Sequence, residues 1–234
     1  RLEVLMRLWD AEHQRMISPG EFIGPAERLH LIPELDKWML QATLSLFAQH
    51  PDLLDQIDMV SINISAFSIR ETQFAQFIIN SFQQFNLPPQ KFCFEITETQ
   101  AIVNVESARQ FMQQLREFGA HFALDDFGSG YSGLSVLARF PFSELKVDHT
   151  MIALIDNARM RSAIELALES AQRYNTTFVA EGVETWSQLD ELLSLGITQG
   201  QGHLFSRELG IEALMQFAEN ADARYEHTDS LMAA

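Results

Sequence analysis

The sequence predicts an α/β fold of the (β/α) barrel class, and three observations support this. Short apolar runs rich in β-forming residues alternate with amphipathic stretches of helical length, which is typical of βαβ units around a parallel sheet. The chain has 234 residues, a length that suits one barrel domain of roughly 200–250 residues. Polar residues end successive strand candidates, where barrels of this class build their active sites.

The strand candidates are short runs of four to seven residues, most of them rich in apolar or β-branched side chains. They are Leu2–Leu8, Met59–Ile64, Phe92–Thr97, His121–Asp125, Ser143–Val147, Thr177–Ala180 and Thr198–Gln201. The helical patterns between and after them are Glu34–Gln49, Glu71–Phe85, Val105–Phe118, Met160–Tyr174, Ser187–Leu195 and Ile211–Glu219. Strands and helices thus alternate along most of the chain, as a TIM-like barrel requires.

Seven strands are one fewer than a closed barrel needs. Because a bare sheet edge exposes unpaired backbone groups, we expect an N-terminal strand to be missing from this chain. Residues 1–219 are then one N-terminally incomplete domain. Residues 220–234, polar and ending in small side chains, are expected to form a frayed C-terminal tail.

Composition excludes several classes of function. The formal net charge is −16, which argues against a nucleic-acid polymer as partner, since such binders carry basic patches. No apolar run reaches the roughly 18 residues that cross a membrane. The only cysteine, Cys93, lies in an apolar run and is expected to be a buried thiol. These features fit a cytoplasmic domain, whose parent protein could still be membrane-tethered.

The candidate site consists of polar residues at strand ends. They are Glu3, Asn63, Glu95, Asp125, Asp126, Lys146, Glu181 and Gln201. Carboxylates with an amide oxygen are hard ligands that suit Mg²⁺ or Mn²⁺. The adjacent pair Asp125-Asp126 lets one carboxylate bridge two cations, an arrangement that serves phosphodiester hydrolysis. Lys146 could orient or deprotonate the attacking water, or stabilise charge in the transition state.

An ordered set of motifs resembles the EAL domain, a family of bacterial phosphodiesterases that linearise cyclic-di-GMP to pGpG. The motifs are Glu3-Val4-Leu5 with Arg7, Ile17–Ile23, Asn63-Ile64-Ser65, Glu95–Glu98, Asp125–Gly128, Leu145–Asp148, Ala180–Thr185 and Gln201-Gly202. They run from residue 1 to about 207 in the family's order and approximate spacing. The resemblance implies a TIM-like barrel that uses two Mg²⁺ or Mn²⁺ ions.

The resemblance also implies residue roles. Glu3, Asn63, Glu95 and Asp125 would ligate the first metal, and Asp125, Asp126 and Glu181 the second. Lys146 would touch the attacking water, with Glu181 and Glu184 completing the catalytic set. Arg7 and Gln201 would serve the substrate, Arg7 through a phosphate. Glu98 would anchor the glycine-rich loop Phe127–Gly133, which in this family couples the site to a homodimer interface.

Some positions depart from the family's usual residues. Gly24-Pro25 replaces the more usual Pro-Leu at what we interpret as a substrate-lining turn, and Glu208 stands where proline is common. Neither removes a proposed ligand. For Glu98, the alternative to a loop anchor is a cap on the helix after its strand.

Three functions remain open from the sequence. The first is an active cyclic-di-GMP phosphodiesterase, and the second is a catalytically inactive EAL-like domain that acts as a cyclic-di-GMP receptor or protein-interaction module. The third is an unrelated metal-dependent barrel enzyme, such as an enolase-like proton abstractor, which the Asp-Asp pair disfavours. EAL domains commonly follow sensory or GGDEF domains, so an upstream domain of this kind is expected in the full-length protein.

Overall fold

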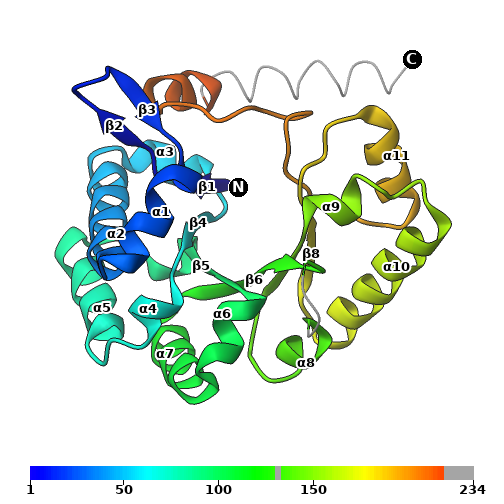
Figure 1. Ribbon diagram of the computed structural model, residues 1–234, viewed down its shortest axis with the longest axis horizontal. Coiled ribbons are helices and arrows are strands. Elements are labelled where there is room, and N and C mark those ends of the chain that lie inside the picture. The colour runs from blue at the N-terminus through cyan, green and yellow to red at the C-terminus, as the bar shows by residue number, and fades with distance from the viewer. Residues whose placement is uncertain (130–132, 219–234) are drawn as a thin grey trace.

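The strands form one curled parallel sheet and one small hairpin. The computed structural model describes residues 1–129 and 133–218. The sheet has six strands in the order β1-β4-β5-β6-β7-β8, and every neighbouring pair is parallel. Their bounds are β1 Leu2–Val4, β4 Val60–Asn63, β5 Phe92–Thr97, β6 His121–Phe127, β7 Glu144–Val147 and β8 Thr177–Ala180. Figure 1 shows the sheet curled like a horseshoe, with helices on its outer side. The predicted α/β class with a TIM-like curled sheet is confirmed.

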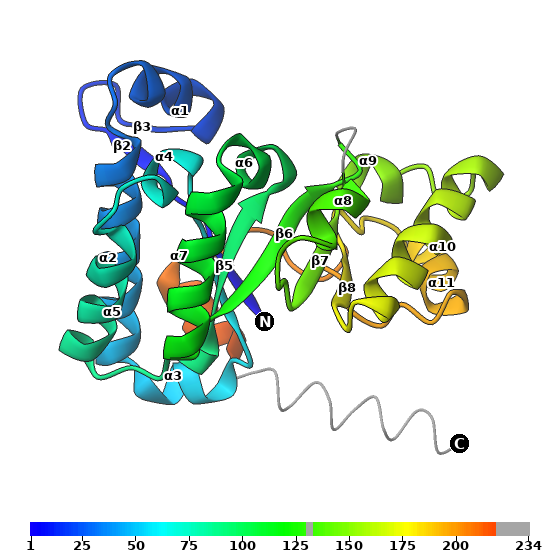
Figure 2. The same ribbon diagram turned by 90° about the horizontal axis from the view of Figure 1, so that it is seen from below.

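Helices follow the strands, as βαβ units require. They are α1 Pro19–Arg28, α2 Ile32–Gln49, α3 Pro51–Gln56, α4 Ala66–Ile69, α5 Phe74–Phe85, α6 Glu98–Val103, α7 Val105–Phe118, α8 Gly133–Leu137, α9 His149–Ile152, α10 Ala158–Arg173 and α11 Trp186–Ser194. A short 3₁₀ turn covers Pro89–Lys91, and residues 211–218 form a further helix. Figure 2 shows α2, α5 and α7 side by side along one part of the sheet, and α10 with α11 along the other. In the part of the chain that the structure describes, no helix is both long and apolar enough to cross a membrane.

The main core lies between the sheet and its outer helices. Central strands are buried along almost their whole length, because helices cover one face and the barrel interior the other. Phe92 of β5 contacts Phe47 of α2 and Phe82 of α5 edge-on, with ring centroids 6.1 and 4.9 Å apart. Such edge-to-face pairs stabilise the layer beyond the area that they bury.

Strand register brings the polar strand ends to one level. Asn63 of β4 lies opposite Glu95 of β5, and Asp125 of β6 lies opposite Thr97. After Leu124 the register between β6 and β7 shifts. Because side chains alternate between the two faces of a sheet, these residues share the inner face at the C-terminal edge. That edge carries the candidate site.

Two sequence expectations need correction. The predicted strand Leu2–Leu8 is interrupted: β1 ends at Val4, and the antiparallel hairpin of β2 (Leu8–Asp10) and β3 (Arg15–Ile17) follows. The Asp10 carboxylate accepts hydrogen bonds from the backbone N–H groups of residues 12 and 13, which stabilises the chain reversal. The predicted strand Thr198–Gln201 reduces to a single parallel bridge between Gly200 and Ala180.

Helix α1 was not expected, because Gly20, Gly24 and Pro25 disfavour a helix interior. The structure nevertheless forms a helix over Pro19–Arg28, so Gly24-Pro25 lies inside a helix and not in the turn that we expected. The expected frayed tail 220–234 lies outside the described residues, as do residues 130–132 of the glycine-rich loop.

The Lys91 side chain should contribute measurably to stability. Its ammonium group donates to the carbonyl oxygens of Leu54, Asp55 and Ile57 at 3.2, 3.4 and 2.6 Å, at the C-terminal end of α3. Lys91→Met keeps an apolar stem but removes the cation from the negative end of that helix. We expect the free energy of unfolding in urea to fall by about 1–2 kcal/mol.

The matched control is Lys37→Met on α2, whose ammonium pairs with exposed carboxylates of Glu34 and Glu71. Exposed ion pairs contribute about 0–1 kcal/mol. Equal losses of stability in the two variants would contradict the structural role of Lys91.

Candidate active site

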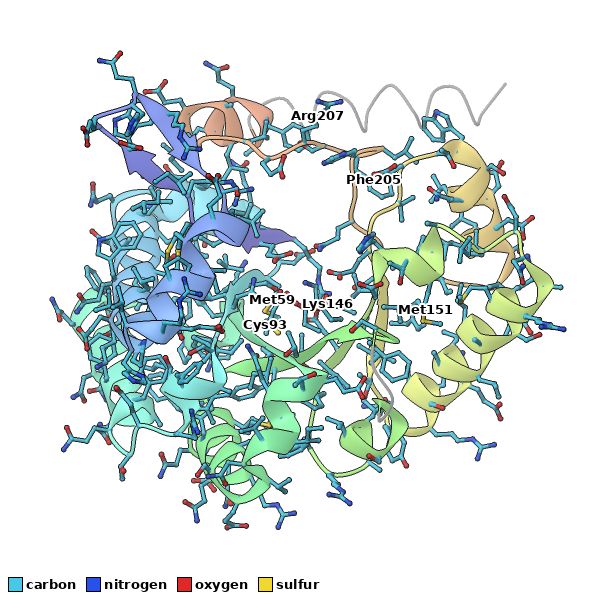
Figure 3. The ribbon with its side chains drawn as sticks, viewed as in Figure 1. Met59, Cys93, Lys146, Met151, Phe205 and Arg207 are labelled. Atoms are coloured by element: carbon cyan, nitrogen blue, oxygen red, sulfur yellow. The ribbon has the colours of Figure 1, made fainter. Side chains whose placement is uncertain are left out.

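Seven of the eight predicted strand-end residues form one connected cluster inside the curled sheet. They are Glu3, Asn63, Glu95, Asp125, Lys146, Glu181 and Gln201. Figure 3 shows Lys146 within the curve of the sheet. The residues come from β1, β4, β5, β6 and β7, from the position after β8, and from the bridge region near Gly200. Convergence of distant segments on one edge is what the strand-end pattern predicted.

Lys146 stands at the centre of this cluster. Its side chain is 3% exposed, and its Nζ atom lies near four carboxylates. The distances are 3.3 Å to Glu3, 2.6 Å to Glu95, 3.1 Å to Asp125 and 2.8 Å to Glu181. An ammonium group has only three N–H donors. One carboxylate oxygen near Nζ, Oδ1 of Asp125, is buried and makes no hydrogen bond within the described residues.

Two amide side chains orient the carboxylates. Nδ2 of Asn63 donates to Oε1 of Glu3 at 2.9 Å. Nε2 of Gln201 donates to Oε2 of Glu3 at 2.9 Å and to Oε1 of Glu181 at 2.7 Å. Gln201 thus connects the first strand to the last across the open side of the sheet. These bonds fix the positions of the carboxylates relative to Lys146.

Burial and charge strongly perturb the ionisation of the cluster. Burial, reinforced by neighbouring carboxylates, raises the pKa of Glu95 to about 8 and that of Glu181 to about 7. The pKa of Glu3 is lowered, because Lys146 and the two amides outweigh its burial. Four surrounding carboxylates raise the pKa of Lys146, so this side chain keeps its proton. The metal-free site therefore combines a permanent cation with carboxyl groups that titrate near neutral pH.

The donor set fits divalent cations. Asp125, Asp126 and Glu181 each offer a carboxylate oxygen, and these atoms lie within 4.8 Å of one another. Asp126 adopts a left-handed backbone with φ of 54°, a conformation that is strained for most side chains and often marks a functional site. Oε1 of Glu95 is also buried without a hydrogen-bond partner in the described part of the chain. Unpartnered buried oxygens are costly unless a cation or proton binds them.

A cavity of about 280 Å³ adjoins the cluster at Asn63. It lies between the segment after β1, helices α1 and α2, and the end of β4. Its apolar lining includes Leu5, Phe22 and Ile23, and its polar lining includes Arg7 and Asp36 besides Asn63. Pockets that enclose whole drug-sized molecules measure roughly 300–1,000 Å³. This cavity therefore suits one ring system of a larger ligand.

The remaining predicted residues lie around the cluster. Arg7 lines the cavity, with Nη1 donating to the carbonyl oxygen of Met6 at 3.0 Å. Glu184 is exposed, with Oε1 3.9 Å from the His203 ring. Glu98 is buried in the first turn of α6. The N-cap of that helix is Thr97, whose hydroxyl accepts from the Gln100 N–H, so the alternative reading of Glu98 as the cap is wrong.

Sequence reasoning missed Asp36, which belongs to the cavity wall. Its Oδ2 atom accepts hydrogen bonds from Ser65 N at 3.0 Å and Ser68 Oγ at 2.6 Å. Burial raises the pKa of this carboxyl group despite those bonds. The missed signal is helical spacing: Asp36 lies three and four residues before the buried Met39 and Leu40, on the inner face of α2.

Comparison with known proteins identifies the family. A model of the EAL domain matches residues 1–208 of the chain. The chain belongs to the EAL domain family. It is 34% identical over 228 residues to the cyclic di-GMP phosphodiesterase PdeB of Shewanella oneidensis, covering 96% of this chain and 26% of PdeB. It is 32% identical over 220 residues to MucR of Pseudomonas aeruginosa, a bifunctional diguanylate cyclase/cyclic di-GMP phosphodiesterase, covering 92% of this chain and 31% of MucR. The chain thus spans a quarter to a third of these relatives.

Solved structures of EAL proteins share this fold. The PaMucR phosphodiesterase in complex with c-di-GMP superposes with a TM-score of 0.83 at 30% identity, covering 91% of this chain and 86% of that one. The EAL enzyme Bd1971, bound to cAMP and cyclic-di-GMP, also gives 0.83, at 26% identity, covering 93% and 59% of the two chains. Both proteins bind cyclic-di-GMP in these structures. The likeness confirms the TIM-like fold that the sequence predicted.

The stability of the metal-free EAL domain should fall as pH rises from about 5 to about 8. In this window the folded state holds protons on Glu95 and Glu181 that the unfolded chain, with carboxyl pKa values near 4.5, has already released. The free energy of unfolding then decreases by up to about 1.4 kcal/mol per pH unit for each group. Calorimetry in chelator should show this fall in Tm, levelling off above the folded pKa values.

Glu95→Gln should flatten the pH dependence, because it removes the most perturbed carboxyl group. Glu165→Gln, on the exposed side of α10, is the matched control and should leave the slope unchanged. A wild-type Tm that rises between about pH 6 and 8 in chelator would contradict the assignment.

Proposed function

We propose that this EAL domain hydrolyses cyclic-di-GMP to linear pGpG. The observation that carries the proposal is a complete carboxylate cluster around Lys146, placed directly beside a cavity of the size of one ring system. Relatives with this domain are named cyclic di-GMP phosphodiesterases. Two solved structures that share its fold, those of PaMucR and Bd1971, hold cyclic-di-GMP. An enolase-like enzyme, by contrast, is excluded by the family assignment.

The cluster is suited to two Mg²⁺ or Mn²⁺ ions. Glu3, Asn63, Glu95 and Asp125 would hold one, and Asp125, Asp126 and Glu181 the other, as oxygen ligands suit these hard cations. When bound, a pair of such ions supplies an activated water and stabilises the charge of the leaving oxygen. Together with Asp126 the cluster has five carboxylates and one ammonium, a formal charge of −4, which two divalent cations would neutralise.

The remaining residues of the site act on the water and the phosphate. In the metal-free site four carboxylates raise the pKa of Lys146 and keep it charged. Beside the bound cations Lys146 would donate a hydrogen bond to the water or to a phosphate oxygen. Arg7 offers a guanidinium group beside the cavity for a phosphate. Gln201 keeps Glu3 and Glu181 in place. Glu184, exposed just before the N-cap of α11, would complete the catalytic residues at the edge of the site.

Asp36 is suited to read a guanine base in the cavity. The Watson–Crick edge of guanine carries two adjacent N–H donors, and a carboxylate is a pure acceptor with about four acceptor sites. The bonds from Ser65 and Ser68 end on Oδ2 and fix the orientation of the group, which keeps acceptor capacity toward the cavity. Apolar side chains such as Phe22 and Leu5 would pack against the faces of the base.

Dimerisation and domain context are further parts of the proposal. Helix α6 packs against β6 and α8, the elements on either side of the loop that follows Asp126, and it leaves Ile102 and Val103 exposed, at 41% and 58%. These side chains support a homodimer interface at that loop, with Glu98 in α6 holding the loop to the site. Residues 1–219 would act as the catalytic domain of a longer protein with an upstream sensory or GGDEF domain, as the name of MucR suggests for that relative.

The competing function is a receptor that binds cyclic-di-GMP without hydrolysing it. Such a domain would tolerate the loss of metal ligands. Here every carboxylate that the family resemblance implies as a metal ligand is present and, apart from the partly exposed Asp126, lies within ion-pair distance of Lys146. The intact set favours the enzyme.

Asp125→Asn should abolish catalysis while the fold persists. This change removes a carboxylate that would contact both cations, so kcat for cyclic-di-GMP in Mg²⁺ or Mn²⁺ should fall by about 100-fold or more. Chelator should have the same effect on the wild-type protein. The Tm in chelator should not fall, because one of several mutually repelling carboxylates is removed. Asp156→Asn, at an exposed aspartate, is the control. Retention of more than about a tenth of wild-type kcat, under ~1.4 kcal/mol of barrier, would refute the bridging role.

Asp36→Asn should remove discrimination between guanine and hypoxanthine. Wild-type protein should bind cyclic-di-GMP more tightly than cyclic-di-IMP, which lacks the exocyclic amine, by roughly tenfold or more, since an unmet buried acceptor costs about 1–3 kcal/mol. In the variant an amide N–H₂ can face the base donors, so both ligands should bind weakly and alike. Calorimetric Kd values test this, with Glu34→Gln on the exposed face of α2 as control. Unchanged discrimination would show that Asp36 does not read the base.

A further inference from the structure

An ion pair joins the cavity to the segment that follows Gln201. Nη2 of Arg7 lies 3.4 Å from Oε1 of Glu208, and the two side chains are 32% and 57% exposed. Nη1 of the same guanidinium donates to the Met6 carbonyl oxygen. The bond to the Met6 carbonyl oxygen therefore holds the Arg7 side chain at the cavity through Nη1, and Glu208 pairs with Nη2 of the same guanidinium group.

The backbone delivers Glu208 to this place. Leu204 N donates to the Val183 carbonyl oxygen at 3.0 Å, and Phe205 N to Gly202 O at 3.0 Å, so the segment leaves the sheet in a defined turn. Leu204 packs against the core before Glu208, and Leu214 does so after it. Figure 1 shows this segment running past the open side of the sheet toward β1, and Figure 3 shows Phe205 and Arg207 along it.

The residue at this position carries charge where the family commonly has proline. Arg7 is the cation that the proposed function assigns to a ligand phosphate. A phosphodiester and a carboxylate each carry one negative charge and both suit a guanidinium fork. They therefore compete for the same donors, and the nearby carboxylate also repels the phosphate.

We propose that Glu208 is an internal competitor of the ligand: it pairs with Arg7 in the free protein and must be displaced when a phosphate binds. This inference rests on the proposed function, since it needs Arg7 to contact a ligand phosphate. Glu208 then sets the affinity of the site without contacting the reacting atoms. Because the pair is long and exposed, its effect is modest, roughly two- to fivefold in affinity.

Steady-state kinetics with cyclic-di-GMP test the inference as a double-mutant cycle of wild type, Glu208→Gln, Arg7→Ala and the double variant. Glu208→Gln should lower KM roughly two- to fivefold with kcat unchanged, as expected for a change in uniform binding. In the Arg7→Ala background the same change should have no effect. Calorimetric Kd values in chelator extend the cycle to variants too slow for kinetics.

Two controls separate this pair from general electrostatics. Glu212→Gln changes the net charge equally at an exposed position nearby and should leave KM as in wild type. Raising the ionic strength from about 0.05 to 0.5 M should shrink the Glu208 effect, because salt screens exposed charges.

Several outcomes would overturn the inference. A KM that is unchanged or higher in Glu208→Gln would show that Glu208 does not compete, and an equal effect in the Arg7→Ala background would show that it does not act through Arg7. A wild-type protein that hydrolyses cyclic-di-GMP while either result holds leaves the proposed function standing. A wild-type protein that binds cyclic-di-GMP without hydrolysing it would overturn the proposed function, and the Kd values would still test the role of Glu208. A wild-type protein that neither binds nor hydrolyses it would overturn both.

Discussion

The contact of one buried ammonium with four carboxylates is the constraint on which this structure depends. Lys146 is 3% exposed and has Glu95 at 2.6 Å and Glu181 at 2.8 Å. Burying a charge is costly unless it is paired, so neither the lysine nor its partners could sit inside the sheet alone. The lysine holds the cluster together in the metal-free state, yet it cannot satisfy every oxygen: Oδ1 of Asp125 stays without a hydrogen bond among the described residues. The site is thus arranged for more positive charge than the chain itself supplies.

The turns that follow the strands hold the charged residues of the site in place. After each of three strands, the N-cap residue of the next helix lies two positions after the site residue. After β8 the N-cap residue lies four positions after it. The caps are Ser65 after Asn63, Thr97 after Glu95, Asp148 after Lys146, and Thr185 after Glu181. Each cap satisfies a helix N–H and fixes where the chain turns. The site residues are therefore held between a buried strand and a capped helix, which limits their movement. Rigid support of this kind is what a multi-ligand site needs to keep its geometry.

The sequence predicted the parts of the fold that depend on local pattern, and it failed where tertiary contacts decide. Strands β5 and β8 and helix α7 have the expected bounds, because their apolar runs and stop signals are strong. The hairpin after β1 was missed, since its strands have three residues each and both faces are largely exposed. The strand-end cluster was predictable because parallel strands bring their C-terminal ends to one edge. The cavity and the role of Asp36 could not be predicted. A polar residue on a helix can be recognised as functional only when the segments that pack against that face of the helix are known.

The electrostatics of the cluster bear on the choice between enzyme and receptor. Replacing one of several crowded carboxylates relieves like-charge repulsion and desolvation, the two causes that raise the pKa values of Glu95 and Glu181. Loss of a ligand should therefore cost little stability or even increase it. A domain that only bound the nucleotide would gain nothing from keeping the full set, because Arg7 and the cavity lie beside the cluster and not within it. Active sites are generally less stable than they could be, since function and stability make different demands. Lys146 thus offsets only part of the destabilisation that this intact carboxylate set causes, and bound cations would offset the rest. This is the physical reason to favour hydrolysis.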